Sequence, residues 1–99
     1  MSDNAARSGF SPFPLGQVAA TPSALAALER SGVAPEALLG RHGRGDWGEL
    51  DECDRQTNRQ SLSSGGRLLS AYNLPHQVRI WIITEADRSA TTLLLPSDY

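Results

Sequence analysis

Polar residues cluster between two apolar runs near the C-terminus, and their types could serve recognition or catalysis. This cluster consists of Thr84, Glu85, Asp87, Arg88, Thr91 and Thr92. Functional residues favour loops that a rigid scaffold positions, so the segment is a candidate binding rim. The alternative, which the sequence favours, is an ordinary hairpin tip in which Arg88 pairs with Glu85 or Asp87. As a rim, its predicted binding residues are Thr84, Glu85, Asp87, Arg88 and Thr91.

A second set of residues could supply acid–base and phosphate chemistry of the kind a nuclease needs. The set is His42, Arg67, Tyr72 and Arg88. A histidine at a helix end and a hairpin tip have no sequence-level reason to meet, so we expect His42 and Arg88 to lie far apart. The favoured role for His42 is structural, in contact with the start of the next helix. The preferred interpretation therefore contains no catalytic residue.

Metal and cofactor sites are not indicated. Carboxylates around Asp51 spread over a helix surface instead of converging on one point, as a hard cation requires. His42 and His76 lack a ligand partner at metal-binding spacing, and Cys53 is the single cysteine. No glycine-rich phosphate loop, nucleophile elbow or dinucleotide fingerprint is present. We expect no metal and no cofactor.

Composition limits the classes of partner. The chain has 99 residues and a formal net charge of −2, and all nine of its basic residues are arginine. Such a chain has no global attraction to nucleic acid, so another protein is the expected partner. No apolar run approaches the roughly 20 residues that span a bilayer. Together with the lone cysteine, this predicts a cytoplasmic protein without a membrane partner; its oligomeric state stays open.

A hairpin organises the predicted fold. Residues 79–84 and 91–95 are rich in β-branched and aromatic side chains, and residues 85–90 are polar. Alternation places Val78, Ile80 and Ile82 on one face, and Trp81 and Ile83 on the other. Because both faces are apolar, we expect a central strand, with Trp81 and Ile83 buried under the helices and the opposite face at least partly covered.

The remaining elements precede this hairpin. A short N-terminal strand within residues 13–20 is followed by a helix that Thr21 caps and that ends at Ser31-Gly32, and by a second helix that Pro35 opens. A third helix is predicted over residues 47–60, with a capping box formed by Asp46 and Glu49. Residues 67–72 form the first strand of a three-stranded antiparallel meander. The fold class is α+β, with residues 1–12 as a flexible tail and residues 13–99 as a single domain.

Several blocks of this sequence resemble a family of short, uncharacterised bacterial proteins found on plasmids and integrated mobile elements. The blocks are residues 13–18, 41–42, 45–48, 67–72, 80–94 and 96–99. Members are labelled "plasmid-related protein" or "type I restriction endonuclease subunit M". At residues 50–55 the chain departs from the Cys-Glu-Glu-Asp-Lys-like run of the family. The resemblance brings no catalytic residues with it.

The methyltransferase label conflicts with the sequence. Such a subunit needs a doubly wound domain for its methyl donor, which 99 residues cannot build, and residues 73–76 lack the second proline and the aromatic of the target-amine tetrapeptide. Two hypotheses remain. The first is a non-enzymatic accessory protein of mobile elements that acts by protein–protein contact, with host defence as one candidate target. The alternative, suggested by element order alone, is a RelE- or ParE-like nuclease acting on RNA.

Overall fold

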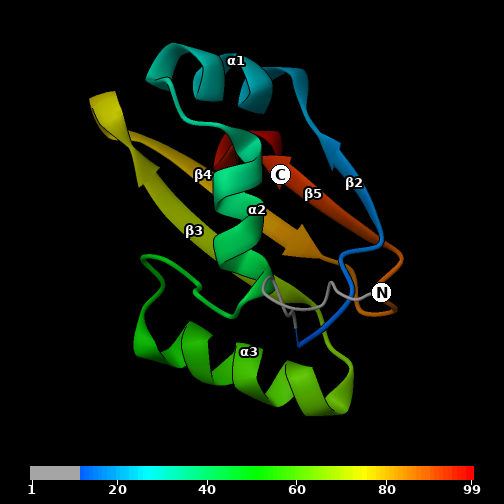
Figure 1. Ribbon diagram of the computed structural model, residues 1–99. Coiled ribbons are helices and arrows are strands. Elements are labelled where there is room, and N and C mark those ends of the chain that lie inside the picture. The colour runs from blue at the N-terminus through cyan, green and yellow to red at the C-terminus, as the bar shows by residue number, and fades with distance from the viewer. Residues whose placement is uncertain (1–11) are drawn as a thin grey trace.

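A computed structural model of the chain describes residues 12–99 and confirms the α+β class (Figure 1). The predicted tail, residues 1–12, lies outside the described residues except for Pro12. The elements are β2 (Gln17–Ala20), α1 (Pro22–Ser31), α2 (Pro35–Gly43), α3 (Glu52–Ser64), β3 (Leu68–Leu74), β4 (Val78–Thr84) and β5 (Ala90–Leu94). Short 3-10 turns cover Pro75–Gln77 and Pro96–Asp98.

The four described strands form one mixed sheet in the order β2-β5-β4-β3. Strands β3, β4 and β5 are the predicted antiparallel meander, in which Trp81 pairs with Ala71 on one side and Leu94 on the other. The N-terminal strand β2 runs parallel to β5, with Val18 opposite Thr91. The sheet is therefore mixed and not purely antiparallel. The parallel pair is possible because three helices connect β2 to the meander and return the chain to the same end of the sheet.

Helices α1 and α2 begin and end where the sequence indicates. The Thr21 hydroxyl accepts a hydrogen bond from the Ala24 amide at 3.1 Å, Pro22 occupies the first turn of α1, and Gly32 ends it in a left-handed conformation. Pro35 opens α2. The two helices lie on one side of the sheet (Figure 1) and pack their apolar side chains against it.

The face under α1 and α2 differs from the prediction. Ile80 and Ile82, both fully buried, pack with Leu28 and Leu38 of these helices. Trp81 lies on the opposite face and keeps part of its surface exposed, while Ile83 on that face is buried. The prediction that Trp81 is buried under the helices is wrong, because a strand apolar on both faces does not tell which face receives them.

The predicted capping box is also wrong. Helix α3 begins at Glu52, and its N-cap is Asp51, whose carboxylate accepts the Asp54 amide at 2.9 Å. Asp46 instead pairs with the Arg41 guanidinium at 2.7 Å. Residues 47–49 are not helical because they bond to β3, and Gly48 suits this approach: its φ is +75°, and a Cβ there would lie 2.1 Å from the Ala71 oxygen.

The outer edge of β3 is closed by side chains and by residues 47–49. The Asn58 amide of α3 bonds both peptide groups of Leu69, at 2.6 Å to the oxygen and 3.1 Å from the nitrogen. Ala71 donates to the Trp47 oxygen and accepts from the Glu49 amide. Because an unpaired strand edge invites another strand, this closure directs any partner to a different surface.

Candidate functional site

His42, the predicted acid–base candidate, is fully buried near the C-terminal end of α2. Its Nδ1 lies 2.6 Å from the Ser70 hydroxyl of β3, and its Nε2 lies 2.9 Å from the Thr84 hydroxyl of β4. The predicted separation concerned Arg88, whose guanidinium lies 5.9 Å from the centroid of Phe13, and it stays a prediction; Thr84, at the end of the preceding strand, does reach His42. The two meet because α2 crosses the sheet face that carries Ser70 and Thr84.

The hydrogen bonds continue from His42 through Thr84 and Thr91 to a backbone carbonyl. Because a carbonyl can only accept, this end of the chain determines which group donates in the bonds before it. Thr91 donates to the Leu15 carbonyl at 2.6 Å, so its oxygen accepts the hydroxyl proton of Thr84, 2.7 Å away. Thr84 must then accept from His42 Nε2–H, and because burial keeps the imidazole neutral, Nδ1 carries no proton and accepts from the Ser70 hydroxyl. We assign His42 as the Nε2-protonated neutral tautomer on this basis, and call the chain from Ser70 to Leu15 the His42 network.

Two aromatic rings enclose the imidazole. The centroid of Phe13 lies 5.4 Å and that of Trp47 5.7 Å from the His42 ring, both edge-on. Burial lowers the pKa of His42 to about 4, because the charged imidazolium would lose its hydration in this apolar enclosure. The histidine is neutral at physiological pH.

A hydroxyl bonded to a neutral imidazole is the arrangement that activates a nucleophilic serine. Ser70 and His42 have this geometry, yet both are 0% exposed. A substrate cannot reach the Ser70 hydroxyl in this conformation. The His42 network therefore ties α2, β3, β4, β5 and the segment before β2 together, as a satisfied buried polar network does.

The other three residues of the predicted nuclease set point to separate partners. Tyr72 is buried and donates its hydroxyl to the Asp46 carbonyl at 2.6 Å, and burial raises its pKa to about 12. Arg88 donates to the carbonyl of Ser61 in α3 at 2.9 Å and to that of Gly66, just after this helix, at 2.6 Å. Arg67 is exposed and donates to the Tyr99 hydroxyl. Of the set, only Arg67 lines the pocket described below, and the catalytic role of the set stays a prediction.

The five residues of the predicted binding rim differ in how far they are buried. Thr84 and Thr91 are 0% exposed within the His42 network, and Arg88 is half-buried with its guanidinium bonded to carbonyls. Glu85 and Asp87 remain exposed at the tip. The Ser89 hydroxyl and amide lower the pKa of Asp87. Two of the five predicted residues are therefore exposed to a partner, and Arg88 braces the tip against the end of α3.

A surface that sequence reasoning missed lies on the sheet face opposite α1 and α2. Trp81 packs edge-on against Tyr99, with ring centroids 5.9 Å apart. The Arg67 guanidinium lies over the Tyr99 ring, 5.5 Å from its centroid. Tyr99 is 70% exposed. We call these three residues the aromatic–arginine surface. No signal in the sequence places the last residue of the chain against β4.

Asp98 holds this surface in place. Its carboxylate accepts hydrogen bonds from the hydroxyls of Ser23 and Thr21, the latter at 2.7 Å, and from the Leu95 amide at 2.9 Å. The Ser23 and Thr21 hydroxyls lower the pKa of Asp98. The C-terminal turn is thereby attached to the start of α1, and Tyr99 is positioned over the sheet.

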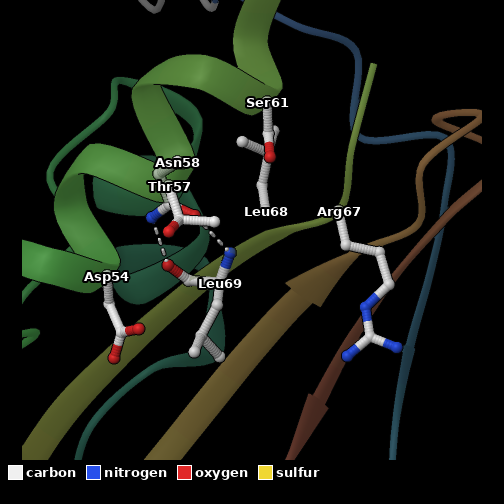
Figure 2. A pocket seen from close by; sticks show the side chains of 7 residues that line it. All are labelled: Asp54, Thr57, Asn58, Ser61, Arg67, Leu68 and Leu69. Atoms are coloured by element: carbon white, nitrogen blue, oxygen red, sulfur yellow. Dashed lines mark hydrogen bonds between the residues drawn. The ribbon is translucent and has the colours of Figure 1, made fainter. Parts of the chain in front are cut away.

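A pocket of about 280 Å³, lined by both polar and apolar side chains, opens between α3 and the start of β3 (Figure 2). Its lining residues are Asp54, Thr57, Asn58, Ser61, Arg67, Leu68 and Leu69. Only Arg67 among them is a predicted site residue, although the polar residues of α3 at helical spacing are a signal that this helix does not bury an apolar stripe.

No helix within residues 12–99 has the length and apolar character needed to cross a membrane. In the same range no group of three or more His, Cys, Asp or Glu side chains gathers as a metal site. Comparison with protein-family models, curated proteins and solved structures finds no match in any of the three.

Proposed function

We propose that this protein is a non-enzymatic binding module that acts through protein–protein contact at the aromatic–arginine surface. The observation that carries the proposal is the grouping of Trp81, Tyr99 and Arg67 on one face, with Tyr99 70% exposed. Tryptophan, tyrosine and arginine are the residues that most often dominate the binding energy of protein interfaces.

The surface is prepared for contact before a partner arrives. Trp81 lies on the central strand β4, and Asp98 attaches the turn that carries Tyr99 to the start of α1. A side chain that is already ordered loses less conformational entropy on binding. The Arg67 guanidinium has five N–H donors, and its hydrogen bond to Tyr99 leaves others for a carboxylate of the partner.

The biological setting belongs to the same proposal. The resemblance to proteins of plasmids and integrated elements supports a role as a cytoplasmic accessory protein, with a host defence protein as a candidate partner. A mild net charge of −2 agrees with a protein partner better than with nucleic acid.

The alternative, an RNA nuclease, has one observation in its favour. Ser70 and His42 form a hydroxyl–imidazole pair at 2.6 Å. General acid–base catalysis needs the base within hydrogen-bonding reach of the substrate, and the complete burial of both side chains opposes this. A nuclease would need a second conformation in which this pair is uncovered.

One experiment separates the two classes. The tagged wild-type protein and its Tyr99→Ala variant are used to capture proteins from a bacterial lysate, and each protein lost with the variant is identified and purified. The purified chain and its His42→Gln variant are incubated with RNA in parallel. We expect a binary complex that forms with wild type alone, and no RNA cleavage. Cleavage by wild type that His42→Gln abolishes would replace the proposal with the nuclease.

A further inference from the structure

Strand β2 leaves one edge of the sheet open, whereas the β3 edge is closed. It stands last in the order of strands, and no helix of residues 12–99 lies outside it (Figure 1). Gln17, Val18 and Ala19 are exposed. An edge strand presents peptide N–H and C=O groups with which another strand can pair, so this edge is a candidate contact surface.

The pairing with β5 determines which peptide groups of β2 are free. Gln17 donates to a carbonyl just before β5 at 2.9 Å, and Thr21 donates to a carbonyl within it at 3.0 Å. Peptide groups alternate in direction along a strand, so those of Val18 and Ala20 point away from β5. Within residues 12–99 no side chain or further strand bonds to them. Each of the two residues therefore offers a donor and an acceptor at the open edge.

The usual protection of an edge strand is missing from β2. Such strands are commonly protected from association by charged side chains, proline or a bulge. Residues Gln17–Ala20 contain no charge and no proline, and their register with β5 is continuous. Val18 exposes 46% of its surface at this edge. The edge is thus suited to pair with a further strand.

We infer that β2 pairs antiparallel with β2 of a second copy of this chain. When Ala19 of one copy faces Ala19 of the other, Val18 of each copy faces Ala20 of the other, and the free groups form four N–H···O bonds. This arrangement has the two-fold symmetry of the commonest homodimers. At its centre the two Cα atoms come within about 4.5 Å, which the small side chain of Ala19 allows.

The side chains of β2 are complementary to themselves in this register. Val18 lies on the sheet face of α1 and α2, because its partner in β5 is the buried Thr91. Ala20 is on the same face and packs against the core under these helices. Val18 of one copy therefore covers Ala20 of the other, on both sides of the axis. Because β2 carries no charge, like charges do not meet across it.

The size of the contact sets its strength. Three paired residues per copy bury much less than the roughly 1,200 Å² of a stable interface. We therefore expect a weak dimer, with a dissociation constant between about 10 μM and about 1 mM. The contact is independent of the aromatic–arginine surface, which lies on the sheet face opposite α1 and α2.

Sedimentation velocity of the whole chain, from about 5 μM to about 2 mM, tests the inference. We expect the mass to rise with concentration from that of one chain toward that of two. Ala19→Glu and Ala19→Arg should each weaken the dimer at least about tenfold, because like charges then meet at the axis. An equimolar mixture of the two variants should associate at least as tightly as wild type, because opposite charges meet.

The controls separate this edge from other surfaces. Gln56→Glu and Gln56→Arg make the same charge changes at an exposed position of α3, beside the β3 edge, and should dimerise as wild type does. Circular dichroism checks that every variant is folded. Tyr99→Ala should also dimerise as wild type does, so its loss of a partner protein bears on the proposed function alone.

Four results would overturn the inference. The first is a wild-type mass that stays at that of one chain up to about 2 mM. The second is dimerisation of Ala19→Glu that is as tight as in wild type, and the third is a mixture of the two Ala19 variants that stays monomeric. The fourth is loss of the dimer in Tyr99→Ala, which would place the contact on the aromatic–arginine surface instead.

Discussion

His42 shows how one buried side chain makes stability depend on pH. Its pKa is about 4 in the folded chain, below the ordinary 6.5, because burial disfavours the charged form. The unfolded chain therefore binds a proton more readily between pH 6.5 and 4. The stability that the neutral histidine contributes is complete above pH 6.5 and is lost as the pH falls toward 4.

We predict a decrease of about 3 kcal/mol in the free energy of unfolding between pH 7 and pH 4 from this residue, at about 1.36 kcal/mol per pKa unit. Urea unfolding at a series of pH values measures it. His42→Gln, which cannot titrate, should lower stability at pH 7 and flatten this slope. An equal slope in the variant and in wild type would contradict the assigned environment of His42.

Thr84 tests how much the His42 network contributes to stability. Thr84→Val keeps the shape of the side chain but leaves the buried His42 Nε2–H without its acceptor. We expect a loss of about 1–3 kcal/mol in the free energy of unfolding. The control is Thr92→Val on the neighbouring strand, where the side chain is partly exposed. If both variants lose the same amount, the network does not contribute the stability assigned to it.

At the scale of elements, α3 is attached to the sheet by a polar side chain. Asn58→Ala leaves both peptide groups of Leu69 without their partner at the β3 edge. We expect a loss of about 1–3 kcal/mol, measured by urea unfolding. Gln56→Ala, exposed on the same helix, should change stability by less than about 0.5 kcal/mol. A wild-type midpoint for Asn58→Ala would show that the edge is not closed by this amide.

The start of α3 gives a second prediction at this scale. Asp51→Ala removes the N-cap and should cost about 0.5–2 kcal/mol in thermal or urea unfolding. Asp46→Ala should cost less, because Asp46 forms a partly exposed ion pair with Arg41, and such pairs contribute little. If Asp46→Ala destabilised the chain more than Asp51→Ala does, Asp46 would be the N-cap and the helix would begin at residue 47.

These elements also show what the sequence could and could not reveal. Helices α1 and α2 and the meander were predictable, because Thr21, Pro22, Gly32 and Pro35 are local signals and the strands have β-branched runs. Asp46 suits an N-cap by residue type, but residues 47–49 pair with β3, so the helix begins only at Glu52, after Asp51. Local patterns carry no information about such pairing.

The candidate sites were less predictable for the same reason. His42 was recognisable as a helix-end residue, but its bonds to Ser70 and Thr84 depend on how α2 crosses the sheet. Tyr99 acquires its place over Trp81 through Asp98, which bonds to residues more than seventy positions away. Long-range contacts of this kind leave no periodic signal in the chain.

At the scale of the whole molecule, the two faces and the β3 edge of the sheet differ in what covers them. Helices α1 and α2 cover one face, side chains and residues 47–49 close the β3 edge, and the opposite face presents the aromatic–arginine surface. Closing one edge while ordering exposed aromatic side chains suits a protein that binds through a sheet face. This arrangement is the basis of the proposed function.

The affinity of the purified partner for the wild-type chain and for three variants tests that proposal most directly. We predict that Tyr99→Ala and Arg67→Ala each weaken the complex at least about tenfold, as loss of an interface hot spot does. Leu25→Ala, which removes a side chain 49% exposed on α1, should bind as wild type does. Equal affinity of Tyr99→Ala, Arg67→Ala and wild type would contradict the assignment of this surface.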